Sequence, residues 1–84
     1  MNKRFKNGPA ATEHEFSVVW NQDRTRFDIR RDGMLTSAYS SQQRVAIGLA
    51  LQAAKQEANE SGEKIIVTSL RNGMRIIEWD GVAA

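Results

Sequence analysis

The chain has 84 residues, and its 12 basic and 10 acidic side chains leave a net charge of only +2, so it is not a polycation. This length allows one small domain, and 40% apolar residues are typical of a folded domain rather than a disordered chain. The absence of cysteine excludes disulfides, thiolate metal sites and cysteine nucleophiles.

The N-terminal segment is predicted to be an arm. Residues 1–14 are polar, and Gly8-Pro9 interrupts any regular structure there. We expect this segment to be flexible and to carry the basic side chains Lys3, Arg4 and Lys6. A single domain is expected over residues 15–82.

Two strands are predicted next, over residues 16–20 and 26–31, with a turn between them. Side chains alternate between the two faces of a strand. The first strand is therefore expected to place on one face Phe16, Val18 and Trp20. In the second strand, one face is expected to carry Phe27, Ile29 and Arg31, and the other Arg26, Asp28 and Arg30.

A turn and a helix follow. Asp32-Gly33 is a turn signal, and residues 34–39 are predicted to add a short third strand. Ser40 and Gln43 have the spacing of a capping box, with Ser41 as an alternative cap. The helix is expected to end at Ser61-Gly62. Its apolar stripe has helical spacing and comprises Ile47, Ala50, Leu51, Ala54 and Ala58.

The last two strands are predicted to form a hairpin around Asn72-Gly73, because this dipeptide suits a turn with two positive φ angles. The expected register pairs Leu70 with Arg75, Thr68 with Ile77 and Ile66 with Trp79. We expect the face with these residues to meet the helix, since it has the larger apolar groups. The opposite face then carries Ile65, Val67 and Ser69 against Asp80, Glu78 and Ile76. The predicted fold class is α+β: an antiparallel sheet of four strands, or five with residues 34–39, and one helix packed on one face.

No catalytic, cofactor or metal site is predicted. The only histidine is His14, which we interpret as a solvated side chain of the arm, because Glu13, His14 and Glu15 cannot close on one metal as strand neighbours. The serines have no histidine or lysine partner at a recognisable spacing, and the glycines do not form a phosphate loop. We expect no enzymatic activity and no small-molecule ligand.

The segment from Asp23 to Gly33 is the candidate binding site. Its four arginines are offset by three aspartates, which gives +4 − 3 = +1. We interpret it first as a solvated strand face with alternating charges. The alternative is a nucleic-acid surface, in which Arg24, Arg26 and Arg30 share the face opposite the helix and the arm adds Lys3, Arg4 and Lys6.

The run Phe27-Asp28-Ile29-Arg30-Arg31-Asp32-Gly33, the alanine-rich helix and the final hairpin resemble the bacterial domain-of-unknown-function family 2188. The likeness covers residues 17–81. The chain departs from that family's pattern at Phe27, where tryptophan is typical, at Ser69 and Leu70 in place of histidine-glycine, and in a longer link from helix to strand. The first half resembles, more faintly, the arm-binding domains of phage integrases. The resemblance implies a compact sheet-and-helix domain and no particular activity.

The sequence thus leaves two functions. The first is a binding module of the accessory or inhibitor type, of bacterial or phage origin, that contacts a protein partner or a second copy of itself. The alternative is nucleic-acid binding. No apolar run approaches the roughly 18 residues of a membrane helix, and the first ten residues lack an apolar signal core, so we expect a soluble, cytoplasmic protein.

Overall fold

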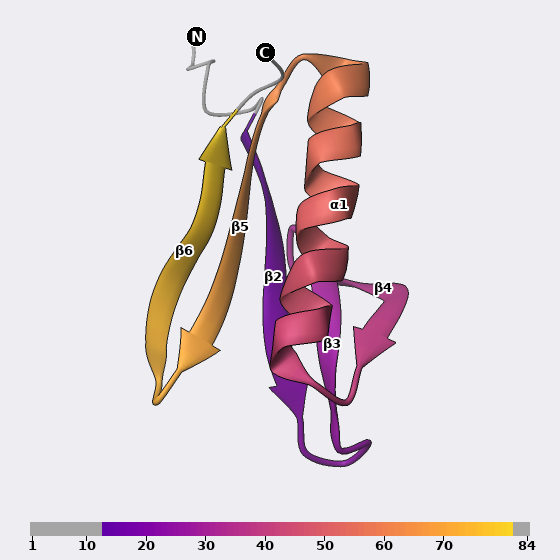
Figure 1. The fold of residues 1–84 in the computed structure, drawn as a ribbon, viewed down its shortest axis with the longest axis vertical. Helices are drawn as coiled ribbons and strands as arrows, with labels where there is room; N and C mark the ends of the chain where they lie inside the picture. Colours follow the sequence, from indigo (N-terminus) through magenta and orange to yellow (C-terminus); the bar gives the residue numbers. More distant parts are fainter. Residues whose placement is uncertain (1–12, 82–84) are drawn as a thin grey trace, which may run out of the picture.

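The computed structural model describes residues 13–81, which form a sheet with one helix lying along one of its faces (Figure 1). The predicted arm residues Lys3, Arg4 and Lys6 lie outside this range. In chain order the elements are β2 (Glu13–Asn21), β3 (Arg26–Arg31), β4 (Met34–Ser40), α1 (Gln43–Ser61), β5 (Lys64–Arg71) and β6 (Met74–Gly81). The α+β class, the order of the elements and the strand over residues 34–39 are confirmed.

The sheet is mixed rather than antiparallel. Its strand order is β4-β3-β2-β5-β6, and the central pair, β2 and β5, is parallel. The prediction of a fully antiparallel sheet is therefore wrong. The physical reason is the direction of α1, which runs back along the sheet after β4, so that β5 enters in the same direction as β2 (Figure 1). The other three pairings are antiparallel.

The core lies between α1 and one face of the sheet. The helix contributes a stripe of alanines spaced four residues apart, which lets its backbone approach the strands closely. The strands contribute Phe16, Val18, Ile29, Ile65 and Val67, all buried. The fully buried helix residues are Ala46, Ala50, Ala54 and Ala58, whereas Ile47 and Leu51 only flank the core.

The β5–β6 hairpin presents the opposite face from the one predicted. The register is as expected from Leu70↔Arg75 to Thr68↔Ile77, but a bulge then follows, and Val67 pairs with Trp79. Ile65 and Val67 pack against the helix, and Thr68, Leu70 and Ile77 lie on the other face. The bulge moves Trp79 onto the helix side, where it joins Ile65 and Val67. From the sequence, Ile65 and Val67 were expected on the face away from the helix.

The turns follow local signals, but the helix start does not. Asn72 and Gly73 both have positive φ, 51° and 77°, as a type I′ turn requires. The predicted capping box is wrong: Gln42 is the N-cap, without a side-chain cap, and the Ser40 hydroxyl accepts from the backbone N–H of Gln42 (3.1 Å) instead. This bond turns the chain two residues before the helix begins.

Two glycine substitutions test the described helix end. Gly62 is left-handed, with φ 73°, and its N–H bonds the carbonyl of Ala58, whereas Gly48 lies within the helix. An added Cβ meets nothing within 4 Å at either position, so the backbone alone decides the effect. Gly62→Ala is expected to lower the free energy of unfolding by about 1 kcal/mol. Gly48→Ala is expected to raise it by about 0.5–1 kcal/mol. Urea unfolding of both variants measures the free energy of unfolding. If both substitutions raised it, or both lowered it, by the same amount, the helix end at Gly62 would be contradicted.

Two further features concern the ends of the fold. The first described strand begins at Glu13, so Glu13 and His14 belong to the sheet and not to the predicted arm. Within residues 13–81, no helix is long and apolar enough to cross a membrane.

Candidate functional site

The face of the sheet opposite α1 is the candidate site. We call it the outer face. It is defined by register: Ser17 lies between Arg30 on β3 and Thr68 on β5, and Thr68 lies opposite Ile77 on β6. On the far side of β3, Leu35 of β4 lies opposite Arg30. Within residues 13–81, no helix covers this face (Figure 1).

Asp28 organises the β3 side of the outer face. Its side chain is only 3% exposed, and it accepts hydrogen bonds from Asn21 Nδ2 (2.8 Å) and Arg26 Nε (2.8 Å). These donors, the hydrogen bond from Asn21 first, hold the pKa of the Asp28 carboxyl below its usual range, although its burial opposes them. The guanidinium of Arg26 also lies over the ring of Tyr39, with 3.9 Å to its centroid. Arg26 is therefore a structural part of the face with its charge neutralised.

The other predicted site residues fall in different places. Arg30 is on the outer face, where its Nη1 donates a hydrogen bond to the carbonyl of Gly33 (3.1 Å). The Arg30 guanidinium makes no ion pair with another described residue. Arg24 lies in the turn between β2 and β3, and its backbone N–H donates to Asn21 Oδ1 (3.2 Å). The structure thus brings Arg26 and Arg30 onto one face, as predicted, and leaves Arg24 beside it.

Charges on the outer face are divided between two halves. The acidic half lies where β2 and β5 begin; with Glu13, Glu15, Asp80 and Lys64 it has a charge of −3 + 1 = −2. The basic half extends from the middle of the sheet to the end of β2; with Arg26, Arg30, Arg75 and Asp28 it has +3 − 1 = +2. Lys64 bridges Glu13 and Asp80, at 3.3 and 3.4 Å, and Arg75 reaches Glu15 at 3.3 Å. The whole face is neutral but strongly dipolar.

Large apolar side chains are exposed at both edges of the outer face. Leu35 and Tyr39 lie on β4, with 55% and 53% of their surface exposed, and Leu70 and Ile77 lie on β5 and β6, with 47% and 53% exposed. An open depression of about 360 Å³ lies at the end of β2, lined among others by Val19, Asp28 and Arg30. Exposed apolar groups at the edges of one face, with charged groups between them, are typical of a docking surface.

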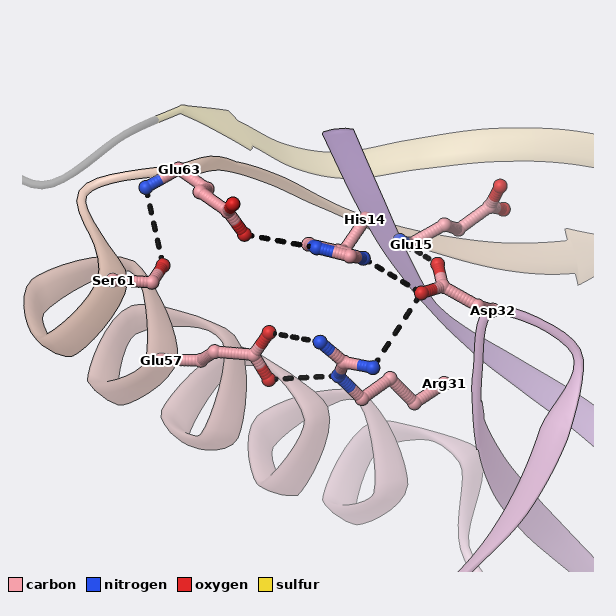
Figure 2. Close-up of polar contacts among 7 residues, drawn as sticks. All are labelled: His14, Glu15, Arg31, Asp32, Glu57, Ser61 and Glu63. Carbon is pink, nitrogen blue, oxygen red and sulfur yellow. Dashed lines mark hydrogen bonds and ion pairs between the residues drawn. The ribbon is translucent and has the colours of Figure 1, made fainter. Parts of the chain in front are cut away.

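A second polar cluster lies on the helix side, around His14 (Figure 2). The His14 Nδ1 is 2.7 Å from Asp32 Oδ2, and its Nε2 is 2.9 Å from Glu63 Oε1. Arg31 makes a two-pronged contact with Glu57, through Nε (2.9 Å) and Nη2 (2.5 Å), and its Nη1 lies 3.5 Å from Asp32. We call these five residues the His14 cluster. It links β2, β3, the β3–β4 turn, α1 and the loop between α1 and β5.

The His14 cluster favours a protonated imidazole. Two carboxylates can accept hydrogen bonds from both ring nitrogens only when both nitrogens carry a proton. The bond to Asp32, and secondarily that to Glu63, raises the pKa of His14 above its ordinary value of 6.5. The paired guanidinium of Arg31 lowers the pKa of Glu57, and the backbone N–H of Glu15 together with His14 lowers that of Asp32 against its burial. The cluster therefore connects these elements through charged hydrogen bonds, which are strongest when His14 is protonated.

Sequence reasoning missed two of these features. His14 was interpreted as a solvated arm residue, but 79% of its side-chain surface is covered (21% exposed). Its partners lie 18 and 49 residues away, so no local pattern links them. Arg75 was expected beneath the helix, and it lies on the outer face instead because the hairpin presents the other side. The prediction rested on the larger apolar groups beside Leu70, Thr68 and Ile66, but the core uses the face of Ile65 and Val67.

Another groove lies between α1 and the β5–β6 hairpin. It measures about 440 Å³ and is lined by Gln43, Arg44, Ile47, Arg71 and Glu78. Its one carboxylate, Glu78, accepts a hydrogen bond from Ser69 Oγ (2.6 Å) and lies 3.7 Å from Arg71. No group of three or more histidine, aspartate or glutamate side chains among residues 13–81 is placed to hold a metal ion.

Comparisons of the chain with protein-family models, curated proteins and solved structures gave no match.

Proposed function

We propose that this protein is a non-enzymatic binding module that contacts another protein chain through the outer face. The observation that carries the proposal is the unequal coverage of the sheet. One face is buried by α1, and the other leaves Leu35, Tyr39, Leu70 and Ile77 exposed. Burying such side chains against a partner is favourable, at about 25 cal/mol for each Å² of apolar surface removed from water.

The charge of the outer face favours a protein over a nucleic acid. Four cations, Arg26, Arg30, Lys64 and Arg75, are balanced by four anions, Glu13, Glu15, Asp28 and Asp80, so the face sums to zero. A phosphate-binding surface requires unbalanced positive charge. On β3 itself, the buried Asp28 offsets one of the two outward-facing arginines, Arg26.

Photo-crosslinking in the cell of origin tests this proposal. A photoreactive amino acid at Ser17 or Ile77 places the probe on the outer face, and one at Gln52 places it on the exposed side of α1 as a matched control. We expect protein adducts from the two outer-face positions and none from Gln52. Adducts from Gln52 alone, or none at any position, would contradict the proposal.

Nucleic-acid binding is the second candidate, favoured by one observation: Arg30 on the outer face makes no ion pair with another described residue. It would use Arg24, Arg26 and Arg30 with Lys3, Arg4 and Lys6, the last three outside the described residues. Fluorescence anisotropy with single- and double-stranded DNA and RNA at about 50 mM salt distinguishes the two functions. We expect no saturable binding. Saturable binding that weakens steeply with salt and is lost in Arg30→Ala would establish this candidate instead.

A further inference from the structure

We infer that the partner of the outer face is a second copy of this chain, stacked face to face so that the acidic half of each copy lies over the basic half of the other. This inference rests on the proposed function, because it names the occupant of the same face. The two copies are related by a two-fold axis that lies between the sheets and runs across the strands.

Charge complementarity carries the choice of a second copy. The acidic half has −2, and the part of the basic half beyond the middle row, with Arg26, Arg75 and Asp28, has +2 − 1 = +1, so the face is its own electrostatic complement when one copy is turned end for end. Asp80 and Arg75 illustrate the match, since both lie on β6, on opposite sides of Ile77. A two-fold contact pairs residue i with j and j with i, so every favourable contact occurs twice.

The alternative stack, with the axis along the strands, is disfavoured by the same charges. It would place acidic half over acidic half and basic half over basic half, and like charges at an interface oppose association. In the end-for-end stack, the apolar side chains of β4 lie over β4 of the other copy, and those of β5 and β6 lie over the same two strands of the other copy. Ile77 and Leu35 lie near the middle rows of the face, where the two copies come together.

The size of the outer face suits a weak dimer. Five strands at about 4.8 Å spacing span about 24 Å, and six residues at about 3.3 Å each span about 20 Å. The face therefore measures about 500 Å², and two faces would bury about 1,000 Å² in total, at the lower end of specific interfaces. We expect a dissociation constant on the order of 10 to 100 μM rather than a permanent dimer.

Sedimentation equilibrium of the full chain, with charge-reversed variants, tests the inference. Variant one carries Arg75→Glu, and variant two carries Asp80→Lys. Each variant alone would stack like charges and is expected to dimerise about tenfold more weakly than the wild type. Their mixture restores opposite charges at both contacts and is expected to recover dimerisation. A variant with Arg44→Glu on the helix is the control for a charge change of the same size, and it should dimerise like the wild type.

The outcomes are distinct. A wild type that stays monomeric to about 1 mM, variants that dimerise as well as the wild type, or a mixture that fails to recover, would each overturn the inference. Circular dichroism checks that the variants are folded. If a charge-reversed variant is unfolded, Ile77→Ser at the exposed centre of β6 takes its place, with about a tenfold weaker dimer expected and unchanged association overturning the inference.

The same experiments separate this inference from the proposed function. A monomeric wild type that still gives protein adducts from Ser17 or Ile77 would refute the second copy and leave a different protein partner. A monomeric wild type without adducts would refute both.

Discussion

Replacing Asp28 with alanine is expected to lower the free energy of unfolding by about 3 kcal/mol, because it leaves buried polar partners unpaired. The carboxylate is 3% exposed and accepts from both Asn21 and Arg26. Without it, Asn21 Nδ2 loses an acceptor, and the Arg26 guanidinium, 19% exposed, keeps its charge without a counter-ion. Urea unfolding at neutral pH measures the loss.

The matched control for this substitution is Asp23→Ala. Asp23 lies exposed in the β2–β3 turn, so the same chemical change should shift the free energy of unfolding by less than about 0.5 kcal/mol. A loss below about 1 kcal/mol in Asp28→Ala would show that the Asn21–Asp28–Arg26 contact contributes little.

Asp28→Ala also raises the charge of the outer face from zero to +1, so this variant should gain affinity for nucleic acid relative to the wild type at low salt.

Stability is expected to fall as the pH rises above about 6.5, through the raised pKa of His14. The folded state binds the imidazole proton more tightly than the unfolded chain, because Asp32 and Glu63 accept from the two ring nitrogens. The stabilisation from the His14 cluster is thus fully present below 6.5, the pKa of His14 in the unfolded chain, and is lost once His14 is neutral. We expect a loss of about 1 kcal/mol, since the cluster is partly open to solvent.

His14→Gln is the control for this pH dependence. Glutamine can donate one hydrogen bond to either carboxylate but does not titrate, so the variant should be less stable at pH 6 and nearly independent of pH up to pH 9. Thermal unfolding at pH 6, 7.5 and 9 compares the two proteins. Two results would contradict this role of the His14 cluster: a wild type whose stability does not change over this pH range, or a His14→Gln variant whose stability falls as much as that of the wild type. Loss of stability at acid pH is separate, because it follows the lowered pKa values of Asp32 and Glu57.

Local signals predicted much of the fold. The bounds of β3, the turn at Asn72-Gly73 and the helix end at Gly62 each depend on a few adjacent residues, and the structure confirms all three. Alternation along β3 also placed Phe27 and Ile29 toward the helix and Arg26 and Arg30 away from it. The resemblance to the domain-of-unknown-function family stays a prediction.

Long-range contacts account for the features that the sequence did not predict. The parallel pairing of β2 with β5 depends on where the chain returns after α1, which no local pattern specifies. The bulge between Val67 and Thr68 adds one residue, Glu78, to β6, and so turns Trp79 to the helix side and Asp80 to the outer face. His14 gains its role only because Asp32 and Glu63, distant in sequence, come to either side of its ring.

The candidate site was predicted in part for the same reason. The arginine strand pointed to the correct face, through Arg26 and Arg30, but charge counting along the sequence could not show that Asp28 is buried against Arg26. Nor could it show that Arg75, from a hairpin assigned to the other face, completes the basic half. Only the assembled sheet displays a neutral face with separated charges.

Methyl NMR across a concentration series tests the central claim, that two copies of the chain dock through the outer face, most directly. Leu35, Leu70 and Ile77 report on the outer face, and Val45 and Leu49 are exposed apolar residues of the helix that serve as internal controls. Between about 10 μM and 1 mM protein, a range that brackets the expected dissociation constant, we expect the outer-face methyl signals to shift along a common binding curve while the helix signals stay fixed. Shifts confined to Val45 and Leu49, or none at any of the five residues, would contradict the account.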